Sequence, residues 1–193
     1  IPDKTKSGKR FSLDFNIECS EDALVEMSLT SLNGFFRGSG DISLKYDPKN
    51  GTQINGIYNL TYGQCTLSLE TLIRKNFTLM EGSYLRFNGD PLATELNLQT
   101  YHNVNSVSIY DLDPSATSSN NVRVRCLMNI NGNVADPQIA FDIDMPYGTS
   151  EEKDILASAI STEEQRNLQF MYLLAIGRFY TYDTNAMNSG LNL

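Results

Sequence analysis

Apolar and polar side chains alternate along much of this chain, most regularly between residues 54 and 87. A period of two residues is the signature of a β-strand that buries one face and leaves the other in water. The apolar positions include Tyr58, Leu60 and Tyr62 in one run and Cys65 and Leu67 in the next, with polar residues between them. The pattern therefore predicts a mainly β chain whose strands are each apolar on one side only.

Short segments rich in Gly, Pro, Asn and Asp separate the alternating runs. Residues 47–51 (DPKNG) supply the side chains that a hairpin reversal needs, and residues 88–91 (NGDP) end another run. Gly89 in the second segment can take the positive φ that such a turn favours. Strands and turns recur at a spacing of roughly ten residues, which is typical of an antiparallel meander. We expect this sheet to occupy residues 11–146.

Beyond the predicted sheet, the apolar period changes from two to about 3.6 residues, which indicates helix. Thr149 with Glu152 fits a capping box, in which each side chain bonds to the backbone N–H of the other residue. Ser161 with Glu164 fits a second one. We therefore predict two helices within residues 149–180.

The second predicted helix is apolar on nearly every side, because Phe170 and Leu174 lie outside the apolar stripe that includes Met171. A helix of this kind needs a cover from another part of the protein. The segments at both ends of the chain are polar. We expect residues 1–10 to form a frayed lead-in and residues 181–193 a disordered tail.

Charge and motifs exclude several classes of function. The formal net charge of −8 leaves no excess of Lys and Arg with which to bind a phosphate backbone, so no nucleic acid is expected as a partner. No phosphate-binding, dinucleotide-binding or zinc-binding signature is present. His102, the single histidine, has no partner residue at a catalytic spacing. The sequence predicts no enzyme, no cofactor and no metal site.

The chain contains three cysteines, Cys19, Cys65 and Cys126, which are far apart in the sequence. Cys65 and Cys126 stand in phase with apolar neighbours, which favours small buried side chains over ligands or reactive groups. A disulfide between two of the three is left open by their spacing.

Four segments carry a more specific signal. They are GSYLRFNGDP (82–91), VRCLMNING (124–132), DPQIAFDIDMP (136–146) and LLAIGRF (173–179). In this order and at these spacings they resemble the C-terminal region of TamB-family proteins, translocation and assembly module subunits that are AsmA-like, in their Bacteroidetes-type form. The resemblance covers residues 54–180.

The resemblance implies both a fold and a role. Related proteins curl a long sheet into an open, taco-like trough lined by apolar side chains, a lining that suits phospholipid acyl chains because each methylene removed from water gains about 0.8 kcal/mol. The full-length protein is then anchored in the inner membrane by an upstream helix and extends through the periplasm. The resemblance thus implies a segment of a conduit that transports phospholipid between the inner and outer membranes.

The candidate groove-lining residues are the apolar members of the alternating runs within the region of resemblance. They are Ile54, Tyr58, Leu60, Cys65, Leu67, Leu69, Phe77, Leu79, Leu85, Phe87, Leu96, Leu98, Val124, Cys126, Met128, Ile139, Phe141 and Ile143.

The family's partnership with TamA implies a second role, in which the chain docks on an outer-membrane barrel of the Omp85 type and supports outer-membrane protein assembly and secretion. An open sheet edge can accept a strand from such a partner. The second predicted helix, through Phe170, Leu174 and Phe179, is the other candidate docking element.

The alternating pattern by itself does not decide between an open trough and two sheets closed face to face as a β-sandwich. The alternative function is therefore an extracellular β-sandwich that binds carbohydrate or adheres to surfaces. The absence of Trp weakens this alternative, because no aromatic platform for a sugar is evident.

Overall fold

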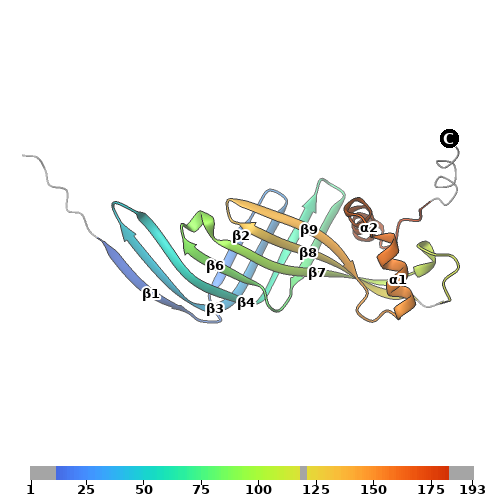
Figure 1. The fold of residues 1–193 in the computed structure, drawn as a ribbon, viewed down its shortest axis with the longest axis horizontal. Coiled ribbons are helices and arrows are strands. Elements are labelled where there is room, and N and C mark those ends of the chain that lie inside the picture. The colour runs from blue at the N-terminus through green and yellow to red at the C-terminus, as the bar shows by residue number, and fades with distance from the viewer. Residues whose placement is uncertain (1–11, 118–120, 183–193) are drawn as a thin grey trace, which may run out of the picture.

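The computed structural model describes residues 12–117 and 121–182 of the 193-residue chain. Within them, nine strands form one antiparallel sheet, and two helices follow it. The sheet curls along a long axis, with β1 at one end of the molecule and both helices at the other (Figure 1). The predicted lead-in lies outside the described residues, as does the predicted tail apart from Thr181 and Tyr182.

The elements follow one another in the order of the sequence. They are β1 (Leu13–Cys19), β2 (Leu24–Ser28), β3 (Leu32–Asp47), β4 (Gly51–Leu69), β5 (Ile73–Leu79), β6 (Tyr84–Gly89), the 3-10 turn η1 (Pro91–Ala93), β7 (Glu95–Val107), the 3-10 turn η2 (Ile109–Asp111), β8 (Val122–Asn133), β9 (Asp136–Asp144), α1 (Ser150–Ala159) and α2 (Glu163–Ile176).

Two long strands, β3 and β4, organise the sheet. β1 and β2 both pair with β3, and β5 and β6 both pair with β4 and then with β7. β8 and β9 complete the order, and β9 has a partner on one side only among the described strands. The predicted fold class is confirmed: the chain is mainly β, the antiparallel sheet curls without closing, and helices follow at the C-terminal end.

Turn residues act as the sequence indicates. The Asp47 carboxylate accepts hydrogen bonds from the backbone N–H groups of Lys49 and Asn50, at 2.8 and 2.7 Å, and Gly51 completes the hairpin with φ +71°. Before η1, Gly89 has φ +99° and the Asp90 side chain accepts from the N–H of Leu92. Both reversals rest on local side-chain bonds to the backbone, which explains why the sequence reveals them.

Cross-strand neighbours line up into rungs that cross the inner face of the sheet, because directly opposite residues in an antiparallel pair point to the same side. One rung joins Leu98, Ile130 and Ile139 across β7, β8 and β9. The next rung joins Met128 and Phe141. Successive rungs therefore form one apolar strip along the length of the sheet.

A β-bulge in β4 changes which residues face inward. β3 stays in phase, but Arg37 pairs with Tyr62 while Gly38 pairs with Leu60, so Thr61 is an extra residue on β4. An extra residue moves later side chains to the opposite face. Leu60 is buried, whereas Tyr62, which the alternation grouped with it, is 54% exposed on the outer face.

The helix termini agree with the sequence at α1 and differ from it by one residue at α2. Thr149 and Glu152 form the predicted capping box of α1. At α2, Thr162 and Gln165 form the box in place of Ser161 and Glu164. α2 ends at Ile176, before the predicted boundary, because Gly177 adopts a left-handed conformation with φ +77° and terminates the helix.

Candidate functional site

The curled sheet is filled at its helical end. α2 packs against β5, β8 and β9, and Phe170 lies between two aromatic side chains of the sheet. Its ring centroid is 4.2 Å from that of Phe141 and 6.1 Å from that of Phe77, with an interplanar angle of 21° in both pairs. Phe170 has no exposed surface. This end of the trough is thus occupied by the protein's own helix.

At the opposite end, the same inner face is left open. A groove of about 280 Å³ runs between β1, β2, β3, β4 and β6, and nearly all of its lining is apolar. Its walls are Ile17, Cys19, Ala23, Leu24, Val25, Ile42, Leu44, Ile54, Tyr58 and Phe87. Ile17, which is 44% exposed, and its β1 neighbours Leu13 and Phe15, at 42% and 49%, are large apolar residues that no described part of the chain buries.

Rungs continue through this open end. Ile17 pairs with Ile42, and Leu44 pairs with both Phe15 and Ile54, so these side chains share the face that carries the buried core further along. The groove is therefore a continuation of the filled part of the trough, without the helix that fills it.

Tyr58 belongs both to the lining of the groove and to the buried core. Tyr58 is 3% exposed, and its hydroxyl donates a hydrogen bond of 2.7 Å to the carbonyl oxygen of Ala23 in the turn between β1 and β2. Burial raises the pKa of this phenol above its ordinary value, which keeps the hydroxyl a donor. A Cβ on Gly40 would lie 2.0 Å from the Ile57 carbonyl oxygen, so glycine is what lets β3 approach β4 beside this tyrosine.

The predicted lining residues differ in how deeply the structure buries them. Most are buried inside the protein: Tyr58, Leu60, Cys65, Leu67, Phe77, Leu79, Leu85, Leu96, Leu98, Val124, Cys126, Met128 and Ile143. Four are half-buried, namely Ile54, Leu69, Phe87 and Phe141. Ile139 is 41% exposed on the edge strand β9, which pairs on one side only among the described strands. The groove brings together only Ile54, Tyr58 and Phe87 from this set.

The other seven groove residues belong to segments before residue 54. Ile17, Ile42 and Leu44 alternate with polar neighbours in the same way as the residues of the later strands, so the sequence does carry a signal for them. They precede residue 54, where the resemblance that defines the candidate set begins. Ala23 and Leu24 carry no such signal, because they come from the β1–β2 turn and the start of β2.

The candidate docking helix presents a different face from the one expected. Phe170, Leu174 and Phe179 are 0%, 1% and 3% exposed, packed within the protein's own core. Ile176, at 62% exposed, and Leu168, at 37%, are the apolar side chains that α2 presents to solvent. In this conformation, the three residues predicted to dock are buried and do not form part of the surface.

Comparison with known proteins identifies the family of this open, curled sheet. Residues 2–192, nearly the whole chain, match the TamB C-terminal domain. The chain belongs to the TamB family. No curated protein and no solved structure matches the chain. TamB proteins act in the cell envelope and are associated with a TamA partner there.

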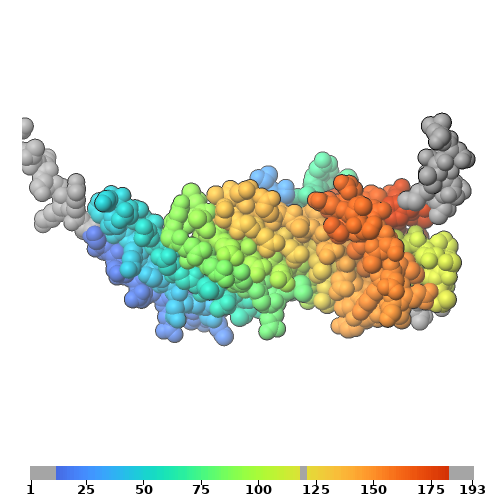
Figure 2. Space-filling view, in the orientation of Figure 1, coloured from blue at the N-terminus to red at the C-terminus, as the bar shows by residue number. Residues whose placement is uncertain are grey.

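Neither helix of this TamB domain is long and apolar enough to cross a lipid bilayer, within the residues that the structure describes. Figure 2 shows the elongated surface, with the helical segment in orange and red at one end and the strands β1 to β3 toward the other. The two ends of the TamB trough therefore differ in kind, one helical and filled, the other a bare strand surface.

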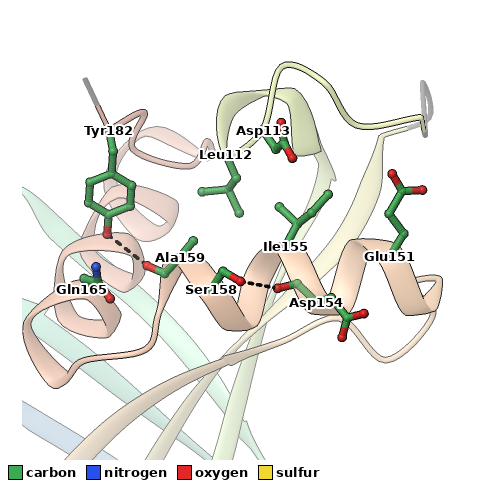
Figure 3. Close-up of a pocket in the computed structure, with 9 residues that line it drawn as sticks. All are labelled: Leu112, Asp113, Glu151, Asp154, Ile155, Ser158, Ala159, Gln165 and Tyr182. Atoms are coloured by element: carbon green, nitrogen blue, oxygen red, sulfur yellow. Dashed lines mark hydrogen bonds between the residues drawn. The ribbon is translucent and has the colours of Figure 1, made fainter. Parts of the chain in front are cut away.

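A second hollow of this TamB domain lies outside the trough, between α1 and the segment after η2 (Figure 3). Asp113, Glu151 and Asp154 contribute carboxylates to it. The pKa of Glu151 is lowered by hydrogen bonds from the hydroxyl and backbone N–H of Thr117, and that of Asp113 by similar bonds from Ser115. Glu151 thus ties the first turn of α1 to the loop after η2, and Asp113 braces a turn within that loop.

Proposed function

We propose that this TamB domain holds phospholipid acyl chains in the open groove, as one segment of a conduit that moves phospholipid between the inner and outer membranes. The observation that carries the proposal is the row of large apolar side chains, Phe15 and Ile17 above all, that the described residues leave exposed on the face that is elsewhere a packed core. Uncovered apolar surfaces of this kind mark binding grooves in soluble proteins.

The chemistry of the groove fits an acyl chain better than a polar ligand. Its lining offers apolar side chains and almost no hydrogen-bonding group, since the Tyr58 hydroxyl is already bonded to Ala23. Each methylene that enters gains about 0.8 kcal/mol from leaving water, with no directional bond to hold it in one place. The headgroup stays in water at the open side. The proposal involves movement of lipid and no chemical conversion of it.

Cys19 provides a native probe for occupancy of the groove. It lines the groove and is partly exposed, whereas Cys65 and Cys126 are buried. Thiolate is the reactive form of cysteine, and burial raises the pKa of Cys65 to about 11 and that of Cys126 to about 12. Near neutral pH, maleimide is therefore expected to label Cys19 and to leave the other two thiols unmodified.

We expect phospholipid to slow the labelling of Cys19 about tenfold or more, because an acyl chain in the groove covers the thiol and excludes reagent, a population shift that corresponds to about 1.4 kcal/mol. The measurement is the rate of maleimide addition by mass spectrometry, with and without vesicles of phosphatidylethanolamine and phosphatidylglycerol. A variant with Ile57→Cys on the outer face serves as control, because lipid in the groove leaves that side chain accessible. Equal rates at Cys19 with and without lipid argue against the proposal.

A second candidate function is strand addition by an Omp85-type barrel partner at β9. The observation that favours it is that β9 pairs only with β8 among the described strands, so one side of its backbone has no strand partner. Such an edge can accept a strand from another protein. Because Phe170, Leu174 and Phe179 are buried, the sheet edge suits this role better than the helix.

A photo-crosslinker tests the β9 edge. Gln138 is exposed on β9, and Asn55 is exposed on β4 at a point where that strand pairs with both β3 and β6. With the crosslinker at position 138, we expect capture of the barrel protein from the envelope, identified by mass spectrometry, and at position 55 we expect none. Capture at both positions or at neither would count against strand addition at β9.

A further inference from the structure

The face beneath α2 belongs to the same strip as the open groove. Starting from the groove, rungs follow one another from Tyr58 with Leu85, through Leu98 with Ile130, to Met128 with Phe141. Met128 and Phe141 belong to the part of the sheet on which α2 lies. The strip is therefore apolar along its whole length. α2 covers it at one end, and the open groove lies at the other.

α2 contacts the strip through apolar side chains, as an apolar ligand would. Phe170 projects from α2 between Phe77 and Phe141, and its contacts with them are ring against ring. Leu173 and Leu174, each 1% exposed, complete the buried face. Contacts of this type are not directional, so an acyl chain can replace them without leaving polar groups of the sheet unpaired.

Polar bonds of the helical segment run to its own backbone and to the η2 region. The side chain of Gln169, which is buried, donates to the carbonyl oxygen of Tyr180 and accepts from its N–H, both at 2.8 Å. Arg178 forms a bidentate pair with Asp111, at 2.7 and 3.2 Å. The Gln169 bonds lie within the segment and move with α2 when it leaves the strip. The Arg178 pair at the end of the segment, and the bonds from Thr117 to Glu151 at its start, tie it to the η2 region.

We propose that the strip beneath α2, centred on Phe77, Met128 and Phe141, is a second acyl-chain site, and that α2 occupies it in competition with lipid. The inference rests on the proposed function, because it takes the open groove as the entry point for the chain. A lipid that advances along the strip displaces α2 about the segment 146–148 (PYG), between β9 and α1. The domain thereby alternates between a strip closed by its own helix and a strip filled by lipid.

Photo-crosslinking at two positions tests this competition. Benzoylphenylalanine at position 141 replaces the half-buried Phe141 on the edge strand β9, where its ring lies against Phe170. The same residue at position 54 replaces Ile54 in the open groove. Each variant is irradiated after removal of lipid and after loading with phosphatidylethanolamine and phosphatidylglycerol vesicles, and adducts are identified by mass spectrometry.

Without lipid, position 141 is expected to crosslink to the α2 peptide that contains Phe170. With saturating lipid, we expect this crosslink to fall at least fivefold while a lipid adduct appears at position 141. Lipid capture at position 54 together with an unchanged α2 crosslink at position 141 overturns the inference and leaves the open groove as the whole site. No lipid adduct at either position overturns both the inference and the proposed function.

A variant that weakens the attachment of the α2 segment to the η2 region tests the same competition independently. Arg178→Ala removes the bidentate pair with Asp111, whereas Arg178→Lys keeps the charge at that position. The lipid adduct at position 141 is expected to increase in Arg178→Ala at limiting lipid and to change little in Arg178→Lys. A lipid adduct at position 141 that is equal in both variants, with α2 still crosslinked, overturns the role of α2 as a competitor.

Discussion

Replacing Ile17 by Asp is expected to weaken phospholipid binding about tenfold or more, which corresponds to about 1.4 kcal/mol. Ile17 lines the open groove, and its side chain is 44% exposed, so the fold does not depend on burying it. A carboxylate at this position holds water in the apolar wall, and an acyl chain passing it would have to remove that water. The measurement is equilibrium binding of a fluorescent phospholipid to the purified domain.

Ile57 supplies a matched control for this substitution. It is also an isoleucine in the sheet and is 42% exposed, but it alternates with the inward Tyr58 and so lies on the outer face. Ile57→Asp is expected to leave lipid binding unchanged, and both variants are expected to unfold in urea close to the wild-type midpoint. Equal losses of lipid binding in the two variants would show that charge, and not the groove, decides the outcome.

The direction in which each side chain points could be predicted for most strands. Alternation of apolar and polar residues depends only on the strand itself, so it places Leu98 and Met128 inward whatever the curvature of the sheet. The same holds for the turn at Asp47, whose carboxylate bonds to its own neighbours in the chain. Local interactions of this kind can be predicted from the sequence without knowledge of the fold.

Which part of the trough is filled could not be predicted in the same way. Phe77, at 0% exposed, and Ile17, at 44%, stand in similar alternating runs, yet one is in the core and the other in the open groove. The difference depends on where α2 packs, and that is set by contacts between segments far apart in the sequence. A period of two reports that a face is apolar and does not report what covers it.

Two smaller predictions, the inward side of Tyr62 and the first residue of the α2 cap, are each wrong because of a shift by one residue. The bulge at Thr61 carries no strong sequence signal, and it turned Tyr62 to the outer face. At the start of α2, the pairs beginning at Ser161 and at Thr162 both satisfy the capping-box pattern. The structure selects Thr162, and the neighbouring Ser161 hydroxyl bonds to the Gln165 side chain.

Phe170→Ala is expected to lower the free energy of unfolding by about 3–5 kcal/mol, the usual loss for a fully buried Phe. Phe170 has no exposed surface and contacts the rings of Phe77 and Phe141. Ile176→Ala on the same helix is the control, because Ile176 is 62% exposed and its removal is expected to change the free energy by no more than about 0.5 kcal/mol. Urea unfolding followed by circular dichroism measures both.

The same variant distinguishes loosening of α2 from general loss of stability. Cys126 lies on the inner face next to Ile143 and is unexposed, so its thiol becomes reactive when the strip beneath α2 opens. If α2 leaves while the sheet stays folded, maleimide labels Cys126 in Phe170→Ala about a hundredfold faster than in the wild type, at urea concentrations well below the unfolding transition. Ile176→Ala is expected to label at the wild-type rate. The contrary result is a Phe170→Ala protein that loses stability while Cys126 stays unreactive until global unfolding. In that case α2 leaves the sheet only when the whole domain unfolds, and the strip is never open in the folded protein.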